Sequence, residues 1–213
     1  MKTSPRELAI RIAFYVFGSA IIAFGCAVYL LSDTGNDCFN VFMHGVAKTL
    51  HIPYSASHIG INVVILFFLL LFGRSYIKIG TFVSLFIMGP VTDLTVLLLG
   101  DILTTELPYL LRLFIASFSL PITSLGLAII ISANVGIGPN DLLSVFLSER
   151  FNLKYRWVRV CVDITWVVLG WLLGGTAGIM TVAAAFLVGP ISSFFLKPLG
   201  RLLDRLIAKQ DTK

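Results

Sequence analysis

Residues 34–42 read TGNDCFNVF, and residues 136–147 read GIGPNDLLSVFL. In both stretches a glycine precedes an Asn-Asp pair and a short apolar run follows, which predicts a turn that starts a short helix. Gly35 and Gly136 are 101 residues apart, and the Asn-Asp pairs then match after a three-residue insertion. The match between these two stretches indicates that the chain contains an internal repeat.

Further residues match in the same order on both sides of these stretches. The matched positions are Gly25 with Gly126, Val41-Phe42 with Val145-Phe146, Tyr54 with Tyr155, Thr81 with Thr181, and Gly89-Pro90 with Gly189-Pro190. Each half holds three long apolar segments, which is an odd number of membrane crossings. The second half therefore enters the membrane from the opposite side, and such an inverted repeat is typical of secondary transporters.

The composition indicates a membrane protein. Of the 213 residues, 57% are hydrophobic and 13% are charged, whereas soluble domains have about 45–50% apolar and about 25% charged residues. These values exclude an ordinary cytosolic enzyme, a disordered chain and a disulfide scaffold. The three cysteines are not clustered, so the sequence indicates no zinc site.

Six apolar segments are long enough to cross a bilayer, and two others are too short. We expect spans near 9–31, 57–73, 79–100, 109–132, 157–174 and 177–196, and short half-helices over 38–50 and 141–151. The predicted fold is an all-α polytopic membrane protein with six transmembrane helices in two inverted three-helix repeats. The first repeat covers residues 1–104, the second covers residues 105–197, and a cytoplasmic amphipathic tail covers residues 198–213.

The distribution of charge predicts the orientation. With the N-terminus in the cytoplasm, all Lys and Arg residues except Lys48 and Arg112 lie on the cytoplasmic side. The outer connection between the third and fourth spans carries Asp101 and Glu106 instead. We therefore expect a multi-pass protein of the bacterial inner membrane with both termini cytoplasmic. The basic, apolar tail after Lys197 is either an amphipathic helix on the inner leaflet or the end of the last span.

The stretches GIGPNDLLSVFL (136–147) and GWLLGGTAGIMTVAAAFLVGP (170–190) resemble the YczE/YyaS/YitT-type family of bacterial multi-pass membrane proteins. Arg159 and Asp163, in an R-x-x-x-acid pattern at the start of the fifth span, belong to the same resemblance. It covers nearly the whole chain and implies a location and an architecture more than a chemistry. The first half departs from the pattern, because TGNDCF has no Gly-Pro pair.

The starts of the two half-helices carry the polar side chains that we expect to bind a solute. They are Asn36 and Asp37 in the first half, and Gly138, Pro139, Asn140 and Asp141 in the second. A carboxylate at a helix start can accept hydrogen bonds from free backbone N–H groups. Two interpretations therefore remain open. The carboxylates either cap helices at the membrane surface or face a site that binds a polar ligand.

Two Gly-Pro pairs interrupt spans at corresponding positions. Gly89-Pro90 lies in the third span and Gly189-Pro190 in the sixth, where free backbone groups can contact a solute. Asp93 follows the first pair, and a carboxylate within a span is a candidate for proton or cation coupling. The alternative is that the third span ends early and Asp93 lies near the outer interface.

Two further groups of polar residues have competing interpretations. Arg159 and Asp163 are four residues apart on one helix face, where they form a gating ion pair or a structural pair within the bundle. His44, His51 and His58 recur every seven residues, but a proline interrupts the helix and no thiol or carboxylate completes a metal site. We expect these histidines at the surface or at the membrane interface.

The sequence as a whole predicts a secondary transporter for a small solute. It contains no nucleotide-binding motif, haem motif or catalytic triad, so we expect no enzymatic activity, no cofactor and no bound metal. The expected partners are the lipid bilayer and the solute, without nucleic acid, and a homo-oligomer or a membrane partner stays open. The alternative function is a membrane scaffold or accessory factor that supports a partner enzyme through its basic inner face.

Overall fold

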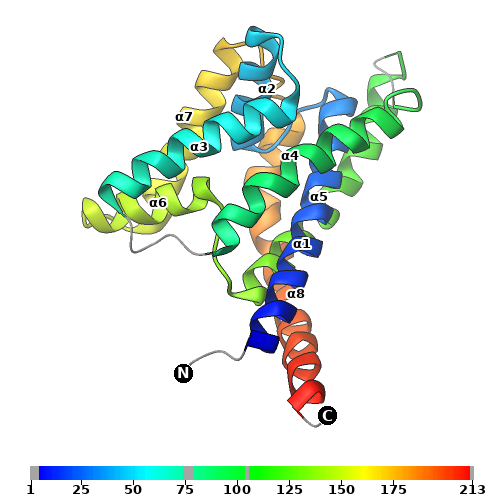
Figure 1. The fold of residues 1–213 in the computed structure, drawn as a ribbon. Coiled ribbons are helices and arrows are strands. Elements are labelled where there is room, and N and C mark those ends of the chain that lie inside the picture. Colours follow the sequence, from blue (N-terminus) through cyan, green and yellow to red (C-terminus); the bar gives the residue numbers. More distant parts are fainter. Residues whose placement is uncertain (1–4, 74–78, 104–105, 212–213) are drawn as a thin grey trace.

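The computed structural model describes residues 5–73, 79–103 and 106–211, and this part of the chain is helical without any strand. Its helices are α1 (Pro5–Ser32), α2 (Cys38–Leu50), α3 (Tyr54–Phe72), α4 (Ile79–Leu99), α5 (Tyr109–Ala133), α6 (Pro139–Arg150), α7 (Tyr155–Leu172) and α8 (Ile179–Asp211). In Figure 1, α1, α5 and α8 form a bundle, and α2, α3, α6 and α7 lie together beside it. The basic residues Lys2, Arg74, Lys78 and Lys213, and the boundary between residues 104 and 105, lie outside the described residues.

The helices follow the predicted segments closely. Each expected span lies in one helix, and the two short stretches form α2 and α6. Five helices, α1, α3, α4, α5 and α8, are long and apolar enough to cross a membrane. Helix α7 has 18 residues and carries Arg159 and Asp163, so its composition does not place it in that group. Helix α8 does not end at residue 197, because the chain continues as one helix to Asp211.

Helices α1 and α5 lie antiparallel and form the centre of the bundle. They approach closely at Gly18 and Gly126, where a Cβ atom on either glycine would lie within 2.9 Å of the carbonyl oxygen of the other. Small residues permit this close approach between helices, and van der Waals packing then stabilises helix pairs in lipid. The position of α5 against α1 therefore depends on the absence of side chains at these two positions.

Each of these two helices binds the end of the other. An Nη1 atom of Arg11 donates to the carbonyl oxygen of Ala133 at 3.2 Å, and an Nη1 atom of Arg112 donates to that of Ser32 at 3.0 Å. Both donors and both acceptors are 101 positions apart. Carbonyl groups in the last turn of a helix lack partners within that helix, and here an arginine of the antiparallel helix supplies one.

The turns that follow α1 and α5 are bound in the same reciprocal way. The backbone N–H of Met180, in α8, donates to Thr34 at 3.2 Å, and that of Gly80, in α4, donates to Val135 at 3.1 Å. The turn after each long helix is thus held by a helix of the other half of the chain.

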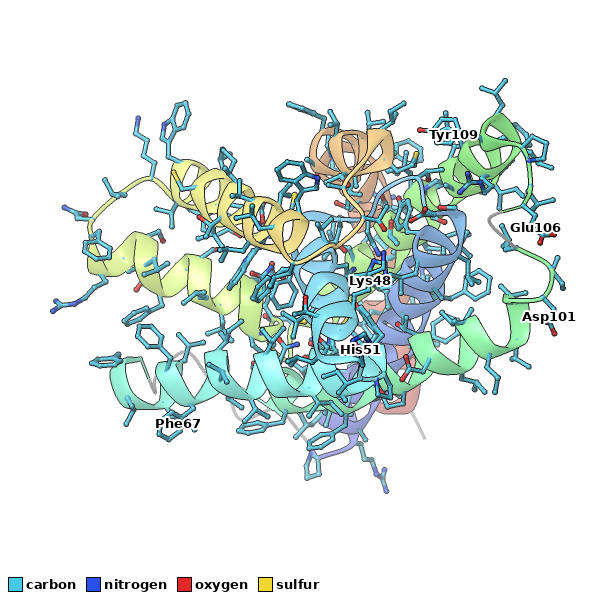
Figure 2. All side chains as sticks on the ribbon, turned by 90° about the horizontal axis from the view of Figure 1, so that it is seen from above. Lys48, His51, Phe67, Asp101, Glu106 and Tyr109 are labelled. Carbon is cyan, nitrogen blue, oxygen red and sulfur yellow. The ribbon has the colours of Figure 1, made fainter. Side chains whose placement is uncertain are left out.

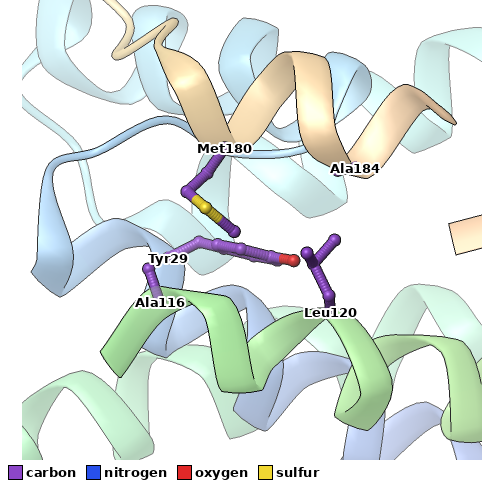
Figure 3. Packing of buried hydrophobic residues seen from close by; sticks show 5 residues of the cluster. All are labelled: Tyr29, Ala116, Leu120, Met180 and Ala184. Carbon is purple, nitrogen blue, oxygen red and sulfur yellow. The ribbon is translucent and has the colours of Figure 1, made fainter. Parts of the chain in front are cut away.

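Two buried clusters lie at opposite ends of the α1–α5 pair. The first contains Tyr29, Ala116, Leu120, Met180 and Ala184, and Figure 3 shows the Tyr29 ring between α5 and α8. The second contains Tyr15, Ile130, Ala133 and Val135, from α1, α5 and the following turn. Because one tyrosine of α1 anchors each cluster, the helix is fixed against its neighbours near both ends.

The short helices pack across the two halves. Phe42 of α2 stacks on Trp166 of α7 with 4.9 Å between ring centroids, and Leu142 and Phe146 of α6 lie in one cluster with Ile65 and Leu69 of α3. The opposite side of α3 is bare and apolar, and Figure 2 shows Phe67 pointing outward from it. Each short helix is therefore held by a long helix of the other half.

Candidate functional site

The turn before each short helix has a left-handed backbone. Asp33 and Gly35 have φ angles of 49° and 116°, and Asn134 and Gly136 have φ angles of 53° and 141°. Glycine adopts such angles without steric cost, and Asn and Asp tolerate the left-handed helical region better than most residues. A Cβ atom on Gly35 would lie 2.8 Å from the backbone nitrogen of Gly178, so the turn also needs a small residue. These residues direct the chain into α2 and α6.

Asp37 caps α2. Its Oδ1 atom accepts hydrogen bonds from the backbone N–H groups of Phe39 at 3.1 Å and Asn40 at 3.4 Å. Because its own backbone is extended, with φ −64° and ψ 158°, it has the geometry of an N-cap residue. Asp37 therefore caps α2, and this contact leaves its part in a ligand site a prediction.

Asn40 connects this cap to α1 and α3. Its Nδ2 atom donates to the second carboxylate oxygen of Asp37 and to the sulfur of Cys26, and its Oδ1 atom accepts from the hydroxyl of Tyr54. The network uses both carboxylate oxygens of Asp37 and joins the start of α2 to α1 and α3. Neither Asn40 nor Tyr54 was predicted as a site residue, although Asn40 lies within the matched stretch.

Asn36 is buried and only partly satisfied. Its backbone N–H donates to the hydroxyl of Thr181 at 3.1 Å, and its Oδ1 atom accepts from the N–H of Asp37 at 2.9 Å. Its Nδ2 atom is buried without a hydrogen-bond partner among the described residues. Asn36 therefore keeps one free donor beside the start of α2.

The start of α6 is built differently. Gly138 occupies the N-cap position without a side chain, and Pro139 follows at the start of the helix. Proline suits this position because its missing N–H would have no partner within the helix. The Oδ1 atom of Asn140 accepts from Nε1 of Trp166 in α7 at 2.7 Å. No side chain caps α6, which leaves Asp141 available for another contact.

Asp141 pairs with Arg159 of α7. An Nη1 atom of Arg159 donates to Asp141, and its Nε atom donates to Oδ2 of Asp163 at 3.0 Å. The other oxygen of Asp163 is buried without a partner in the described part of the chain. The predicted Arg159–Asp163 pair is thus present, and it is extended to α6 by a third residue.

The starts of α2 and α6 both pack against α7. The ring of Phe39 lies 5.4 Å from that of Trp166, whose Nε1 atom donates to Asn140, and Arg159 of the same helix binds Asp141 and Asp163. Burial raises the pKa of Asp37 to about 6. The hydrogen bond from the backbone N–H of Asn40 and the positive charge of Arg159 oppose this effect, whereas the negative charge of Asp163 adds to it. The arrangement can bind a group that carries positive charge or donates hydrogen bonds.

Asp93 lies apart from this cluster. Its two carboxylate oxygens accept from the backbone N–H of Ser55 at 3.3 Å and 3.2 Å, which places Asp93 of α4 at the first turn of α3. Helix α3 begins after Pro53 and has no side-chain cap of its own. Asp93 therefore supplies a cap from a neighbouring helix, a role that sequence spacing does not reveal.

The Gly-Pro pairs differ between α4 and α8. A Cβ atom on Gly89 would lie 2.8 Å from the Cα atom of Ser55, so α4 approaches the backbone of α3 there. A Cβ atom on Gly189 would have no neighbour within 4 Å. Both prolines, Pro90 and Pro190, lie inside their helices. The structure thus places Gly89-Pro90 at a helix contact and Gly189-Pro190 on an open side.

The histidine prediction is wrong for His58, which is 4% exposed in α3. His51 is exposed after α2, and His44 is partly buried. The expectation failed because periodicity alone does not show which face of α3 packs on α2 and α4. Within the described residues, no three His, Cys, Asp or Glu side chains are grouped so that they could hold a metal ion.

The long apolar helices and the relatives of the chain define a multi-pass membrane protein. The chain belongs to a family described as "Family of unknown function (DUF6198)", which matches residues 9–197. It is 27% identical over 206 residues to the "Uncharacterized membrane protein YczE" of Bacillus subtilis, covering 96% of this chain and 94% of that protein. It is also 26% identical over 193 residues to an "Uncharacterized protein" of Haemophilus influenzae, covering 90% and 85%. No solved structure matches. The expected resemblance to the YczE-type family is confirmed.

Proposed function

We propose that this protein is a secondary transporter that moves a small solute across the bacterial inner membrane. The observation that carries the proposal is the convergence of the starts of α2 and α6 on α7, where Trp166 contacts Phe39 and Asn140 and Arg159 binds Asp141. In transporters with inverted repeats, the starts of discontinuous helices bind the solute near the middle of the bilayer. The solute site would then lie between Asp37, Asp141 and Asp163, and the protein would have no catalytic activity.

The proposed architecture has six spans in two inverted repeats, with both termini in the cytoplasm. The antiparallel pair α1 and α5 supports it, as do the reciprocal bonds of Arg11 and Arg112. Helix α7 is the proposed fifth span, in addition to the five helices that are long and apolar enough to cross a membrane. Its charged residues Arg159 and Asp163 neutralise each other, which lowers the cost of inserting them into lipid.

Reconstitution in liposomes tests the transport proposal. The purified protein is exposed to a broad panel of labelled small solutes under proton and sodium gradients, and we expect accumulation of at least one. Arg159→Ala should abolish that accumulation, whereas Arg150→Ala, at the exposed end of α6, should leave it unchanged. The proposal fails if no solute of the panel moves, or if both variants transport equally well.

The alternative function, an accessory factor for a partner enzyme, is tested by crosslinking. The exposed basic residues Arg201 and Arg205 of α8 are the surface that favours it. In that case, crosslinking in native membranes recovers one partner in a stoichiometric complex, and the Arg201→Glu/Arg205→Glu variant loses it. Solute accumulation in liposomes without any partner would exclude this role as the main function.

A further inference from the structure

His58 is a buried imidazole with an unsatisfied nitrogen. It lies one turn into α3, is 4% exposed, and its Nδ1 atom has no hydrogen-bond partner among the described residues. A buried polar atom without a partner costs free energy, and most such atoms in folded proteins are paired. The unpaired nitrogen therefore calls for an explanation beyond packing.

The carboxylate of Asp93 lies at the same end of α3. Ser55, whose N–H donates to Asp93, is three residues before His58 and hence on the same face of α3. Side chains in a helix lean toward its N-terminus, so the imidazole leans toward the turn at which Asp93 is bound. The two groups thus share one end of α3.

The other neighbours of His58 do not replace Asp93. The ring of Tyr54 lies 6.1 Å from the imidazole, measured between centroids, and its hydroxyl donates to Asn40. On the α2 side, the carbonyl oxygen of Met43 accepts from the hydroxyl of Ser57. Neither neighbour offers the imidazole a negative charge, whereas the carboxylate of Asp93 does.

The corresponding position in the second half carries a permanent cation. His58 and Arg159 are 101 residues apart, and so are Asn62 and Asp163. Arg159 binds two carboxylates and cannot lose its charge in a protein. The first half thus has a titratable group where the second half has a fixed charge.

We propose that His58 and Asp93 form a proton-binding site. A proton from water binds to the Nδ1 atom of the neutral imidazole, and the resulting imidazolium is held by the carboxylate of Asp93. The charge of the pair changes from −1 to zero, which lowers the cost of moving the pair through lipid. Gly89-Pro90 precedes Asp93 in α4, so the helix can bend beside the site. The use of this proton to drive solute movement rests on the proposed function, whereas the binding of the proton does not.

An NMR titration of the histidines tests the site. The protein is labelled with ¹⁵N-histidine, placed in lipid nanodiscs and titrated from about pH 8 to about pH 4, and the His58→Gln variant identifies the His58 signals. We expect the His58 ring to become protonated toward the acid end of this range, and Asp93→Asn to lower the fraction that is protonated there. Asp101→Asn, in the exposed connection after α4, is the matched control and should leave that fraction unchanged.

The proposal is overturned if the ring stays neutral down to about pH 4, or if Asp93→Asn leaves the protonated fraction where it was. The signal of the exposed His51 reports whether the variants keep their fold. Failure of the transport proposal is a separate result. If His58 protonates as expected but liposomes accumulate no solute, the proton site stands and transport does not. If solute moves while His58 stays neutral, the proton site alone is wrong.

Discussion

The starts of α2 and α6 carry the same Asn-Asp pair and use it in different ways. In α2, Asp37 caps the helix and also accepts a hydrogen bond from the side chain of Asn40. In α6, Asp141 leaves its own helix uncapped and binds Arg159. The comparison teaches that the pair does not determine its own role. The partners that the surrounding helices supply differ, because Arg159 of α7 binds Asp141 whereas Asn40 of α2 itself binds Asp37.

The largest effect on stability is expected at the start of α6, where Asp141 pairs with Arg159. Arg159→Met leaves Asp141 and Asp163 without their cation, and we expect it to lower the free energy of unfolding by about 2–3 kcal/mol, because unpaired carboxylates in a partly buried site are costly. Thermal unfolding in detergent measures the effect, with Arg150→Met as the exposed control. An equal loss in both variants would contradict the ion-pair role.

The two Gly-Pro pairs give the next contrast. Gly89→Ala places a methyl group against the backbone of α3 and should destabilise the protein by about 1–3 kcal/mol. Gly189→Ala meets no neighbour within 4 Å, so we expect a change within about 0.5 kcal/mol. Thermal unfolding of the two variants in the same lipid–detergent mixture checks this. Similar losses of stability in the two variants would show that α8 is packed as tightly at Gly189 as α4 is at Gly89.

At the start of α2, stability should depend on a hydrogen-bond acceptor at position 37 rather than on its negative charge. Asp37→Ala removes the acceptor of two backbone N–H groups and should cost about 1 kcal/mol. Asp37→Asn keeps a capping oxygen and should cost less than Asp37→Ala. At Asp141, both substitutions should cost the same, since each removes the partner of Arg159. Unfolding midpoints of the four variants provide the measurement, and a reversed order between the two sites would refute the comparison.

A separate test of the capped start is the pH dependence of stability. Burial raises the pKa of Asp37 to about 6 from an ordinary value of 3.8, so between these values the folded state binds more protons than the unfolded state. The contribution of Asp37 to stability is therefore fully present below about pH 4 and is lost as the pH rises through about 6. The difference in unfolding midpoint between wild type and Asp37→Asn, followed from about pH 4 to about pH 8, should show this change. A constant difference would exclude it.

The sequence predicted the helices well because hydrophobic runs and glycine turns act locally. The ranges of α2 and α6, for example, follow from the two Gly…Asn-Asp stretches. The contacts of the site were harder to predict, since they join distant positions. Arg159 reaches Asp141 across 18 residues, and Asp93 reaches the backbone of Ser55 across 38. Spacing along one helix indicated the pair Arg159–Asp163 and gave no sign of the third partner.

The end of α8 shows a second limit of prediction from the sequence. The basic and apolar residues after Lys197 fit both an interfacial helix and an extension of the last span. In the structure α8 continues through Pro198 without a break. Proline within a helix removes one backbone hydrogen bond but does not necessarily end the helix. The composition of this segment therefore did not contain the information that separates the two arrangements.

The bond between Arg112 and the end of α1 has a consequence for how the protein is made. The carbonyl oxygen of Ser32 accepts from an arginine that is synthesised 80 residues later. When α1 enters the membrane during translation, its last turn therefore lacks this partner until α5 has emerged from the ribosome. The end of α5 has no such delay, because Arg11 is already present when Ala133 is made. Until the second half arrives, the carbonyl group of Ser32 therefore needs another partner, such as water.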